Sequence, residues 1–258
     1  MAGTPNSSDK KMRLDLLLTQ AGHFETRARA RDAIARGAVS VDGRACRKPG
    51  ARFSGDVTVN VNDAARPYVS RAALKLIAGL DAFDFDPSGR TVLDAGASTG
   101  GFSQVLLERG AEHVIAVDVG HGQLHPSLRG NPRVSNHEGV NARFLAADIG
   151  AGQPVEAVVS DVSFISLKLA LPPALALAAG GSFCVLLVKP QFEAGRSEVS
   201  RGRGVISDPD VRERVRDEVA EALAEAGCDV LGWTDSPITG ADGNHEFLVH
   251  AVTPEGSP

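Results

Sequence analysis

The chain contains few aromatic residues, few cysteines and no long hydrophobic run. Aromatic residues are 5% of its 258 positions, whereas proteins that stack single-stranded nucleic acid on aromatic side chains usually carry more. The three cysteines, Cys46, Cys184 and Cys228, lie far apart, which excludes a disulfide scaffold and a CxxC zinc site. Charged residues and prolines interrupt the most apolar stretch, residues 155–188, before it reaches the ~20 residues of a membrane span.

The N-terminal sequence has no apolar core of the kind that a secretory signal needs. Hydrophobic residues are 43% of the chain, enough for a folded core in one large domain or in a medium domain with a small one. We therefore expect a soluble, cytoplasmic protein that binds no metal and contacts no membrane.

Charge is divided unevenly along the chain. Residues 1–66 carry 12 Lys/Arg and 7 Asp/Glu, a balance of +5, whereas residues 67–258 carry 15 and 25, a balance of −10. A small basic segment attached to an acidic body indicates a contact with a polyanion, although charge alone also fits an ordinary solvated surface.

The basic segment has the pattern of a small α+β module. Apolar residues at helical spacing between Leu14 and Ala21 predict one helix. A second helix is predicted over residues 27–36, with Thr26 as its N-cap and Gly37 after its end. Residues 38–41, a tight Asp-Gly turn and the alternating valines of residues 57–61 predict a small sheet.

Residues 12–62 resemble the small RNA-binding domain of ribosomal small-subunit protein four. The resemblance is carried by R-L-D-x-L-L from Arg13, R-x-x-A-x-x-A-I-x-x-G-A-V-x-V-D-G from Arg27, K-P-G from Lys48 and D-V-x-V from Asp56. It implies a domain that binds structured RNA through its second helix and hairpin and performs no chemistry. We expect a disordered tail over residues 1–11 and a linker over residues 63–69.

From Arg90 onward, short apolar strands alternate with helical segments. Strands are predicted at residues 91–93, 114–117, 157–160 and 183–188. This alternation is typical of βαβ units in a parallel, doubly wound sheet, whose ligands bind beyond the carboxyl ends of the strands. The polar residues that follow these strands are Asp94, Asp118, Asp161 and Lys189.

The loop after the first of these strands, D-A-G-A-S-T-G-G, permits three interpretations. A dinucleotide site is disfavoured, because the G-x-G-x-x-G spacing is absent and Asp94 would lie beside a pyrophosphate. A hydrolase elbow matches G-x-S-x-G at Ser98, with Asp161 and His245 in the required order. It leaves the other polar strand-end residues without a role.

The third interpretation is a site for S-adenosylmethionine. This molecule carries no phosphate, so that a carboxylate at the loop is tolerated, and glycines let the backbone approach it closely. Asp118 lies 24 residues after Asp94, at the end of the next strand, where it can accept both ribose hydroxyls.

Four ionisable residues form a second pattern. Lys75 lies in a helix predicted to begin near Ser70, Asp161 and Lys189 end strands, and Glu246 begins the last strand. Together they resemble the Lys-Asp-Lys-Glu tetrad of the FtsJ/RrmJ-type ribose 2′-O-methyltransferases. The loop D-A-G-A-S-x-G-G-[FW] also belongs to that family.

A narrower resemblance is to the TlyA family, whose members are often labelled haemolysins. It covers residues 12–251 and is carried by S-R-x-A-x-K-L, D-A-G-A-S-T-G-G-F, D-V-G-x-G-Q-L, N-A-R, S-F-I-S-L, V-K-P-Q-F-E, G-V-I-S-D-P and G-N-x-E-[FY]. The resemblance implies S-adenosylmethionine-dependent methylation of ribose 2′-hydroxyls in ribosomal RNA or ribosomal subunits. It also implies an α/β, Rossmann-like class I methyltransferase domain with a doubly wound sheet, which we expect over residues 70–254.

The resemblance assigns a role to each member of the tetrad. A ribose hydroxyl is a poor nucleophile, and a lysine can take its proton when burial and a second cation disfavour the ammonium form. Lys189 would be this base, Lys75 would position the hydroxyl and act as the second cation, and Asp161 and Glu246 would orient the two lysines. Because the sulfonium is already a good leaving group, much of the catalysis would be in-line positioning.

Further residues are expected from the same motifs. Cofactor contacts are expected at Asp94, Gly96, Ser98, Gly100, Gly101, Phe102, Asp118, Asn141 and Asp148. RNA contacts are expected at Arg13, Arg27, Arg31, Arg44, Lys48, Arg71 and Arg203. Residues 136–140 are expected to follow the third strand, near the adenine.

Two other functions stay open at this point. One is a membrane-active cytolysin, as the haemolysin label suggests. The other is an RNA-binding protein whose methyltransferase domain is inert, although the presence of all four tetrad residues argues against lost activity.

Overall fold

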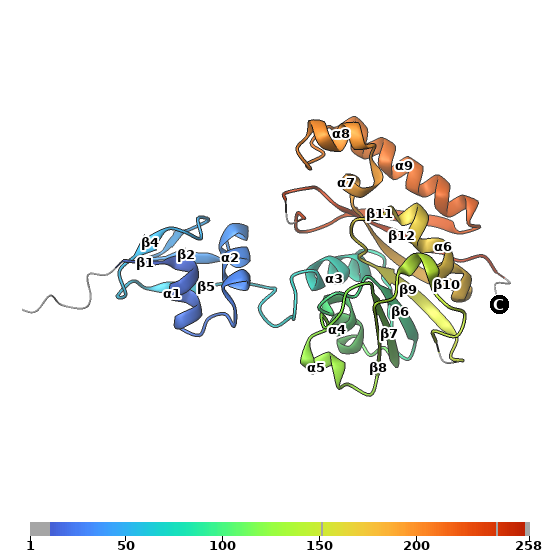
Figure 1. The fold of residues 1–258 in the computed structure, drawn as a ribbon, viewed down its shortest axis with the longest axis horizontal. Coiled ribbons are helices and arrows are strands. Elements are labelled where there is room, and N and C mark those ends of the chain that lie inside the picture. The colour runs from blue at the N-terminus through green and yellow to red at the C-terminus, as the bar shows by residue number, and fades with distance from the viewer. Residues whose placement is uncertain (1–10, 151, 241, 256–258) are drawn as a thin grey trace, which may run out of the picture. The chain divides into compact units, whose positions relative to one another are not determined.

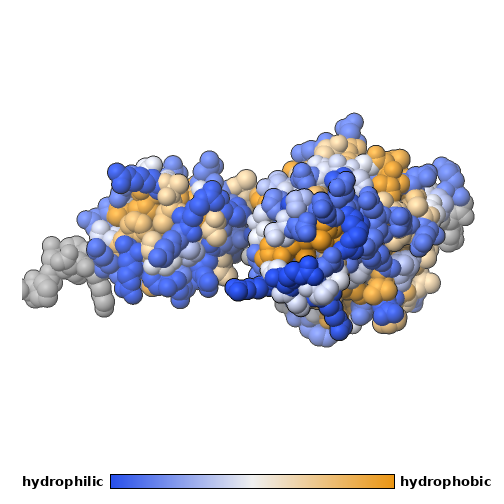
Figure 2. Space-filling model, turned by 90° about the horizontal axis from the view of Figure 1, so that it is seen from above, coloured by the Kyte–Doolittle hydropathy of each residue, from blue (hydrophilic) through white to orange (hydrophobic). Residues whose placement is uncertain are grey.

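The computed structural model describes residues 11–150, 152–240 and 242–255, in two compact units, Met1–Pro67 and Tyr68–Pro258 (Figure 1). The expected tail lies, but for its last residue, outside the described residues. Hydrophilic residues cover most of the face that Figure 2 shows, and the apolar residues on it form separate small patches. In the described part of the chain, no helix is long and apolar enough to cross a membrane.

The first unit contains two helices and short strands around a small core. The elements are β1 (Met12–Arg13), α1 (Leu14–Gln20), α2 (Arg27–Arg36), β2 (Val39–Val41), β3 (Arg44–Ala45), β4 (Arg52–Phe53) and β5 (Val59–Val61). Thr26 caps α2 by accepting a hydrogen bond from the Arg29 amide, and Gly37 ends the helix with φ of 85°. Both predicted helices and the β2–β3 hairpin are confirmed, with Leu14, Leu18 and Ile34 fully buried between them.

The second unit is built on one sheet of seven strands. They are β6 (Thr91–Ala95), β7 (His113–Asp118), β8 (Val134–Glu138), β9 (Val155–Ser160), β10 (Ala178–Val188), β11 (Asp229–Asp235) and β12 (Phe247–Val252). Their order is β11-β12-β10-β9-β6-β7-β8. The strands from β6 to β10 pair in parallel, and β12 runs antiparallel to both of its neighbours. This is the predicted doubly wound sheet.

Helices cover both faces of this sheet (Figure 1). The helices of this unit are α3 (Ala73–Ala82), α4 (Gly101–Glu108), α5 (Pro126–Arg129), η2 (Ala142–Phe144), α6 (Leu167–Leu177), α7 (Pro190–Glu193), α8 (Arg196–Arg201) and α9 (Pro209–Glu225). Successive strand residues point to opposite faces. Thus Val92 packs with α3 and α4, whereas Leu93 packs with α6 and α9. Each such buried side chain contributes about 1.5–3 kcal/mol to folding.

Two expectations about element boundaries are wrong. Helix α3 begins at Ala73 and not at Ser70, because residues 70–72 form a turn in which Ser70 Oγ accepts a hydrogen bond from the Ala72 amide. Of residues 136–140, only Gly139 and Val140 follow the third strand, since Asn136, His137 and Glu138 belong to β8 and pair with β7.

Candidate active site

Two cavities adjoin at the carboxyl ends of the parallel strands. The first has a volume of about 470 Å³ and contains Lys75, Lys189 and Glu246 in its wall, and we call it the lysine cavity. The second has a volume of about 500 Å³ and contains Asp118 and Asn141, and we call it the Asp118 cavity. The residues that line both cavities are Gly96, Ser98, Asp161, Ser163 and Phe164.

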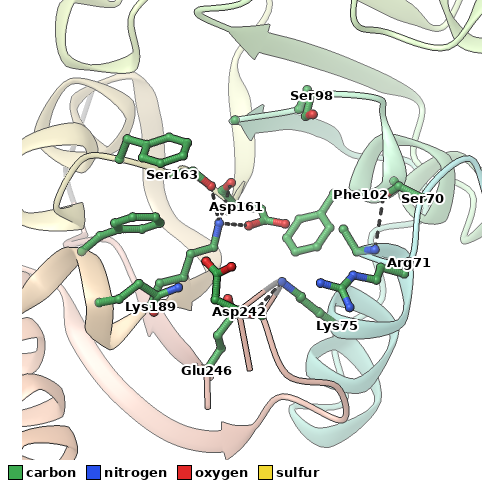
Figure 3. Close-up of a pocket in the computed structure, with 18 of the residues that line it drawn as sticks. Ser70, Arg71, Lys75, Ser98, Phe102, Asp161, Ser163, Lys189, Asp242 and Glu246 are labelled. Carbon is green, nitrogen blue, oxygen red and sulfur yellow. Dashed lines mark hydrogen bonds and ion pairs between the residues drawn. The ribbon is translucent and has the colours of Figure 1, made fainter. Parts of the chain in front are cut away.

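The four tetrad residues form two ion pairs in the lysine cavity (Figure 3). Lys75 Nζ lies 2.6 Å from Glu246 Oε2, and Lys189 Nζ lies 2.5 Å from Asp161 Oδ1. All four side chains are at most 14% exposed. Removal of one charge from such a pair leaves the other buried without compensation, which is strongly unfavourable.

Strand topology explains why these distant residues meet. Asp161 and Lys189 directly follow the parallel strands β9 and β10. Because β12 is antiparallel, its first residue, Phe247, pairs with Val188, the last residue of β10. Glu246 therefore lies at the same edge of the sheet as Lys189.

Helix α3 brings Lys75 to this edge. Gly79 lies against β10 and β12 so closely that a Cβ there would be 2.9 Å from Val185 Cγ1. Lys75 is four residues earlier, on the same face of the helix. The close approach of α3 to the sheet therefore lets the Lys75 ammonium reach Glu246.

Lys189 has further partners besides the Asp161 carboxylate. Its ammonium donates to Ser163 Oγ at 2.7 Å and, at 3.4 Å, to the Asp161 carbonyl oxygen. Sequence reasoning assigned no role to Ser163, although the residue falls within the S-F-I-S-L motif.

The glycine loop between β6 and α4 packs against the segment that follows β9. Gly96 has φ of 87°, and a Cβ there would lie 2.9 Å from backbone atoms of Asp161 and Val162. Asp118 fixes the loop from the other side, because its carboxylate accepts hydrogen bonds from the amides of Ser98 (2.8 Å) and Gly120 (2.7 Å).

Six of the nine residues expected at the cofactor line a cavity. Gly96, Ser98, Asp118 and Asn141 line the Asp118 cavity, and Gly101 and Phe102 line the lysine cavity. The other three, Asp94, Gly100 and Asp148, are in the wall of neither.

Asp94 is fully buried at the end of β6. Burial raises its pKa to about 7, and the negative charges of Asp161 and Asp118 add to this effect. The Ser103 hydroxyl, which donates to Asp94 at 2.6 Å, opposes it.

The hydrolase interpretation finds no support in the geometry around Ser98. Ser98 Oγ donates to Gln123 Oε1 at 3.1 Å. His245 is exposed and lies in the wall of neither cavity. Ser98 therefore has a hydrogen-bond partner other than the histidine that an elbow would need.

The basic residues expected at RNA differ in their surroundings. Arg13 and Arg27 both donate to the buried carboxylate of Asp15 at 3.0 Å and hold the pKa of Asp15 well below its usual range. Arg31, Arg44 and Lys48 are exposed on the first unit. On the second unit, Arg71 lines the lysine cavity and Arg203 is exposed in the turn after α8.

An aromatic pair that sequence reasoning missed lies in the wall of the lysine cavity. Phe164 is 91% exposed and has φ of 63°. Its ring centre is 5.1 Å from that of Phe192 in α7. Positive φ is rare for a bulky residue and marks a segment held by its surroundings.

Known proteins resemble both units of the chain. The sequence model for FtsJ-like methyltransferases matches residues 68–253, and that for the S4 domain matches residues 12–59. A Mycobacterium tuberculosis protein named 16S/23S rRNA (cytidine-2′-O)-methyltransferase TlyA is 44% identical over 241 residues, 93% of this chain and 89% of that protein. Hemolysin A of Brachyspira hyodysenteriae is 37% identical over 93% of this chain and 100% of its own length.

Solved structures agree with these matches. A provisionally named hemolysin from Streptococcus thermophilus superimposes with a TM-score of 0.76 at 38% identity, over 96% of this chain and 90% of that one. Fibrillarin from Aeropyrum pernix, solved with bound S-adenosyl-L-methionine, has a TM-score of 0.51 at 17% identity over 70% of this chain and 74% of its own, which shows a common fold. This chain, as its motifs predict, belongs to the TlyA family of FtsJ-like methyltransferases and carries an N-terminal S4 domain.

Proposed function

We propose that this protein transfers the methyl group of S-adenosylmethionine to a ribose 2′-hydroxyl of ribosomal RNA. The observation that carries this proposal is the pair of buried ion pairs, Lys75–Glu246 and Lys189–Asp161, beside the wall that two cavities share. Membership of the TlyA family supports the same activity, since relatives are named rRNA (cytidine-2′-O)-methyltransferases.

The Asp118 cavity fits the cofactor. Its volume of about 500 Å³ lies in the range of small-molecule sites. Each Asp118 oxygen accepts one backbone amide and keeps a lone pair for a ribose hydroxyl. Gly96 and Ser98 bring the glycine loop into the wall of this cavity. When bound, S-adenosylmethionine supplies a methyl group on a positively charged sulfur.

The lysine cavity fits the acceptor nucleotide. Phe164 offers an exposed ring in its wall, and RNA-modifying proteins stack unpaired bases on such rings. Arg71 adds a cation that can contact a phosphate. The ribose would then lie near Lys75 and Lys189, at the wall that the two cavities share.

The tetrad would deprotonate and position the hydroxyl. Lys189 would take the 2′-proton as general base, and the adjacent Asp161 carboxylate would stabilise the resulting ammonium. Lys75, held by Glu246, would donate a hydrogen bond to the 2′-oxygen and align it with the methyl group. The S4 domain would supply affinity for ribosomal RNA through exposed basic residues such as Arg31, Arg44 and Lys48.

The test is transfer of labelled methyl from S-adenosylmethionine to separate small and large ribosomal subunits. We expect label on ribosomal RNA with the wild-type protein, and at least ~100-fold slower transfer with Lys189→Ala, because a general base contributes about 10²–10⁴-fold. Lys75→Ala should also slow transfer by about 100-fold, because a misplaced acceptor oxygen costs about that much. Lys168→Ala is the matched control, since Lys168 lies on α6 and pairs with Glu218 outside both cavities. Bound cofactor with no label on either subunit would contradict the proposal and favour an inert domain.

A further inference from the structure

Ser163 lies beside Lys189, in the wall that the two cavities share. Its hydroxyl oxygen is 2.7 Å from Lys189 Nζ. The residue is exposed and lines both the lysine cavity and the Asp118 cavity. It therefore lies where the acceptor oxygen and the methyl donor of the proposed reaction would meet.

The hydrogens of the Lys189 ammonium are directed at protein oxygens. An ammonium group carries three hydrogens, and its acceptors are Asp161 Oδ1 at 2.5 Å, Ser163 Oγ at 2.7 Å and the Asp161 carbonyl at 3.4 Å. Lys189 is only 7% exposed. A ribose hydroxyl that enters the lysine cavity would thus reach the Ser163 hydroxyl more readily than Lys189 itself.

A serine hydroxyl can pass a proton on. While Ser163 Oγ accepts from Lys189, it keeps its own hydrogen and a second lone pair. Other serines in the lysine cavity are engaged elsewhere, since Ser98 bonds Gln123 and Ser70 bonds the Ala72 amide. Ser163 is the serine of this wall that contacts the lysine proposed as the base.

We propose that Ser163 is a catalytic residue that relays the 2′-hydroxyl proton to Lys189. This inference rests on the proposed function. Before the step, the Lys189 ammonium releases one proton to water, and Lys189 enters the step as the neutral amine. The O2′–H and C–S bonds break, the O2′–C bond forms, and the C–S electron pair stays on sulfur. The 2′-proton passes to Ser163 Oγ while the proton of Ser163 passes to Lys189 Nζ, which restores the ammonium paired with Asp161.

The first test compares single-turnover methyl transfer to ribosomal subunits by the full-length protein and its variants. Ser163→Ala should slow transfer by ~10-fold or more, with unchanged binding of cofactor and RNA and an unchanged unfolding midpoint. Ser163→Thr, which keeps the hydroxyl, should retain most of the rate. Ser207→Ala is the matched control, because Ser207 is exposed and lines neither cavity.

The second test counts the protons that move. The rate is measured in mixtures of light and heavy water. A relay moves two protons, so the wild-type rate should fall along a curve as the deuterium fraction rises, and the Ser163→Ala rate along a straight line. A merely structural role would not change this shape.

The outcomes separate this inference from the proposed function. A normal rate in Ser163→Ala, or a straight line for the wild type, overturns the relay while methyl transfer stands. Absence of methyl transfer by the wild type overturns the proposed function, and the relay with it.

Discussion

At the scale of single residues, Asp94 shows how burial beneath the glycine loop can make the stability of the fold depend on pH. The carboxyl group is fully buried and its pKa is raised to about 7 by loss of water contact. In the unfolded chain the same group titrates near 4. Between these two values the folded chain keeps a proton that the unfolded chain releases.

This difference predicts the pH dependence of stability. Protonated Asp94 should stabilise the fold fully below about pH 4. This stabilisation should be lost as the pH rises to about 7, and the free energy of unfolding should fall by up to about 1.4 kcal/mol per pH unit. Asp94→Asn should remove this component. Urea unfolding of both proteins between pH 4.5 and 8 measures it, with Asp217→Asn on the exposed face of α9 as control. Equal slopes in the wild type and Asp94→Asn would show that Asp94 does not hold the proton.

The positions of the tetrad were predictable residue by residue, but its pairing was not. Asp161 and Lys189 each follow an apolar strand, and strand ends in such folds carry ligands. That Lys75 faces Glu246 depends on how closely α3 packs at Gly79 and on the insertion of β12 beside β10. No local pattern of residues in the sequence predicts either feature. The same holds for Ser163, whose direction depends on a loop conformation.

At the scale of elements, the glycine loop and the end of β9 depend on each other. Gly96 has a left-handed backbone, and its missing side chain makes room for the backbone of Asp161 and Val162. Backbone atoms cannot rotate away from an added methyl group as a flexible side chain can. A side chain at Gly96 would therefore displace the segment that carries Asp161 and Ser163.

Gly96→Ala should thus damage both stability and catalysis. Gly89→Ala is the matched control, because Gly89 also has a positive φ, of 70°, but no atom within 4 Å of the added Cβ. The control should lose about 1–2 kcal/mol from backbone strain alone and keep normal methyl transfer. Gly96→Ala should lose more stability and most of its methyl transfer, measured by thermal unfolding and labelled transfer. Equal effects of the two substitutions would show that the contact with the β9 segment is unimportant.

Most elements were predictable because their hydrophobic residues recur at the regular spacing of a strand or a helix. Alternating or continuous apolar runs identify β2, β6, β7, β9 and β10, and caps identify α2. The early start expected for α3 was wrong because the turn at Ser70 uses the same residue types as a helix. Strand β8 was misplaced because its last residues, Asn136, His137 and Glu138, are polar at the sheet edge.

At the scale of the whole molecule, the two units have separate hydrophobic cores. One core is formed by residues of Met1–Pro67 and two others by residues of Tyr68–Pro258. The Val69 amide donates to Gln104 Oε1, so the start of the second unit is tied to α4. A chain with its own cores should fold without its neighbour.

A fragment of residues 63–258 should therefore fold and should bind S-adenosylmethionine with the affinity of the full chain. It should bind ribosomal RNA much more weakly than the full chain does. The physical reason is that the removed residues 1–62 carry 11 Lys/Arg against 6 Asp/Glu, whereas the fragment carries 16 Lys/Arg against 26 Asp/Glu and is acidic overall. Calorimetry with the cofactor and filter binding with ribosomal RNA at several salt concentrations would measure both effects. RNA binding by the fragment equal to that of the full chain would show that the S4 domain is not the main RNA contact.

The place of β12 has a consequence during protein synthesis. This strand is the last of the seven in sequence order, yet it lies between β10 and β11 and brings Glu246 to the lysine cavity. A nascent chain thus completes its S4 domain first and gains Glu246, the last member of its tetrad, only after the other six strands of the sheet have been made. While the chain is still being translated, it would already have its RNA-binding unit but could not yet modify the ribosome that is making it.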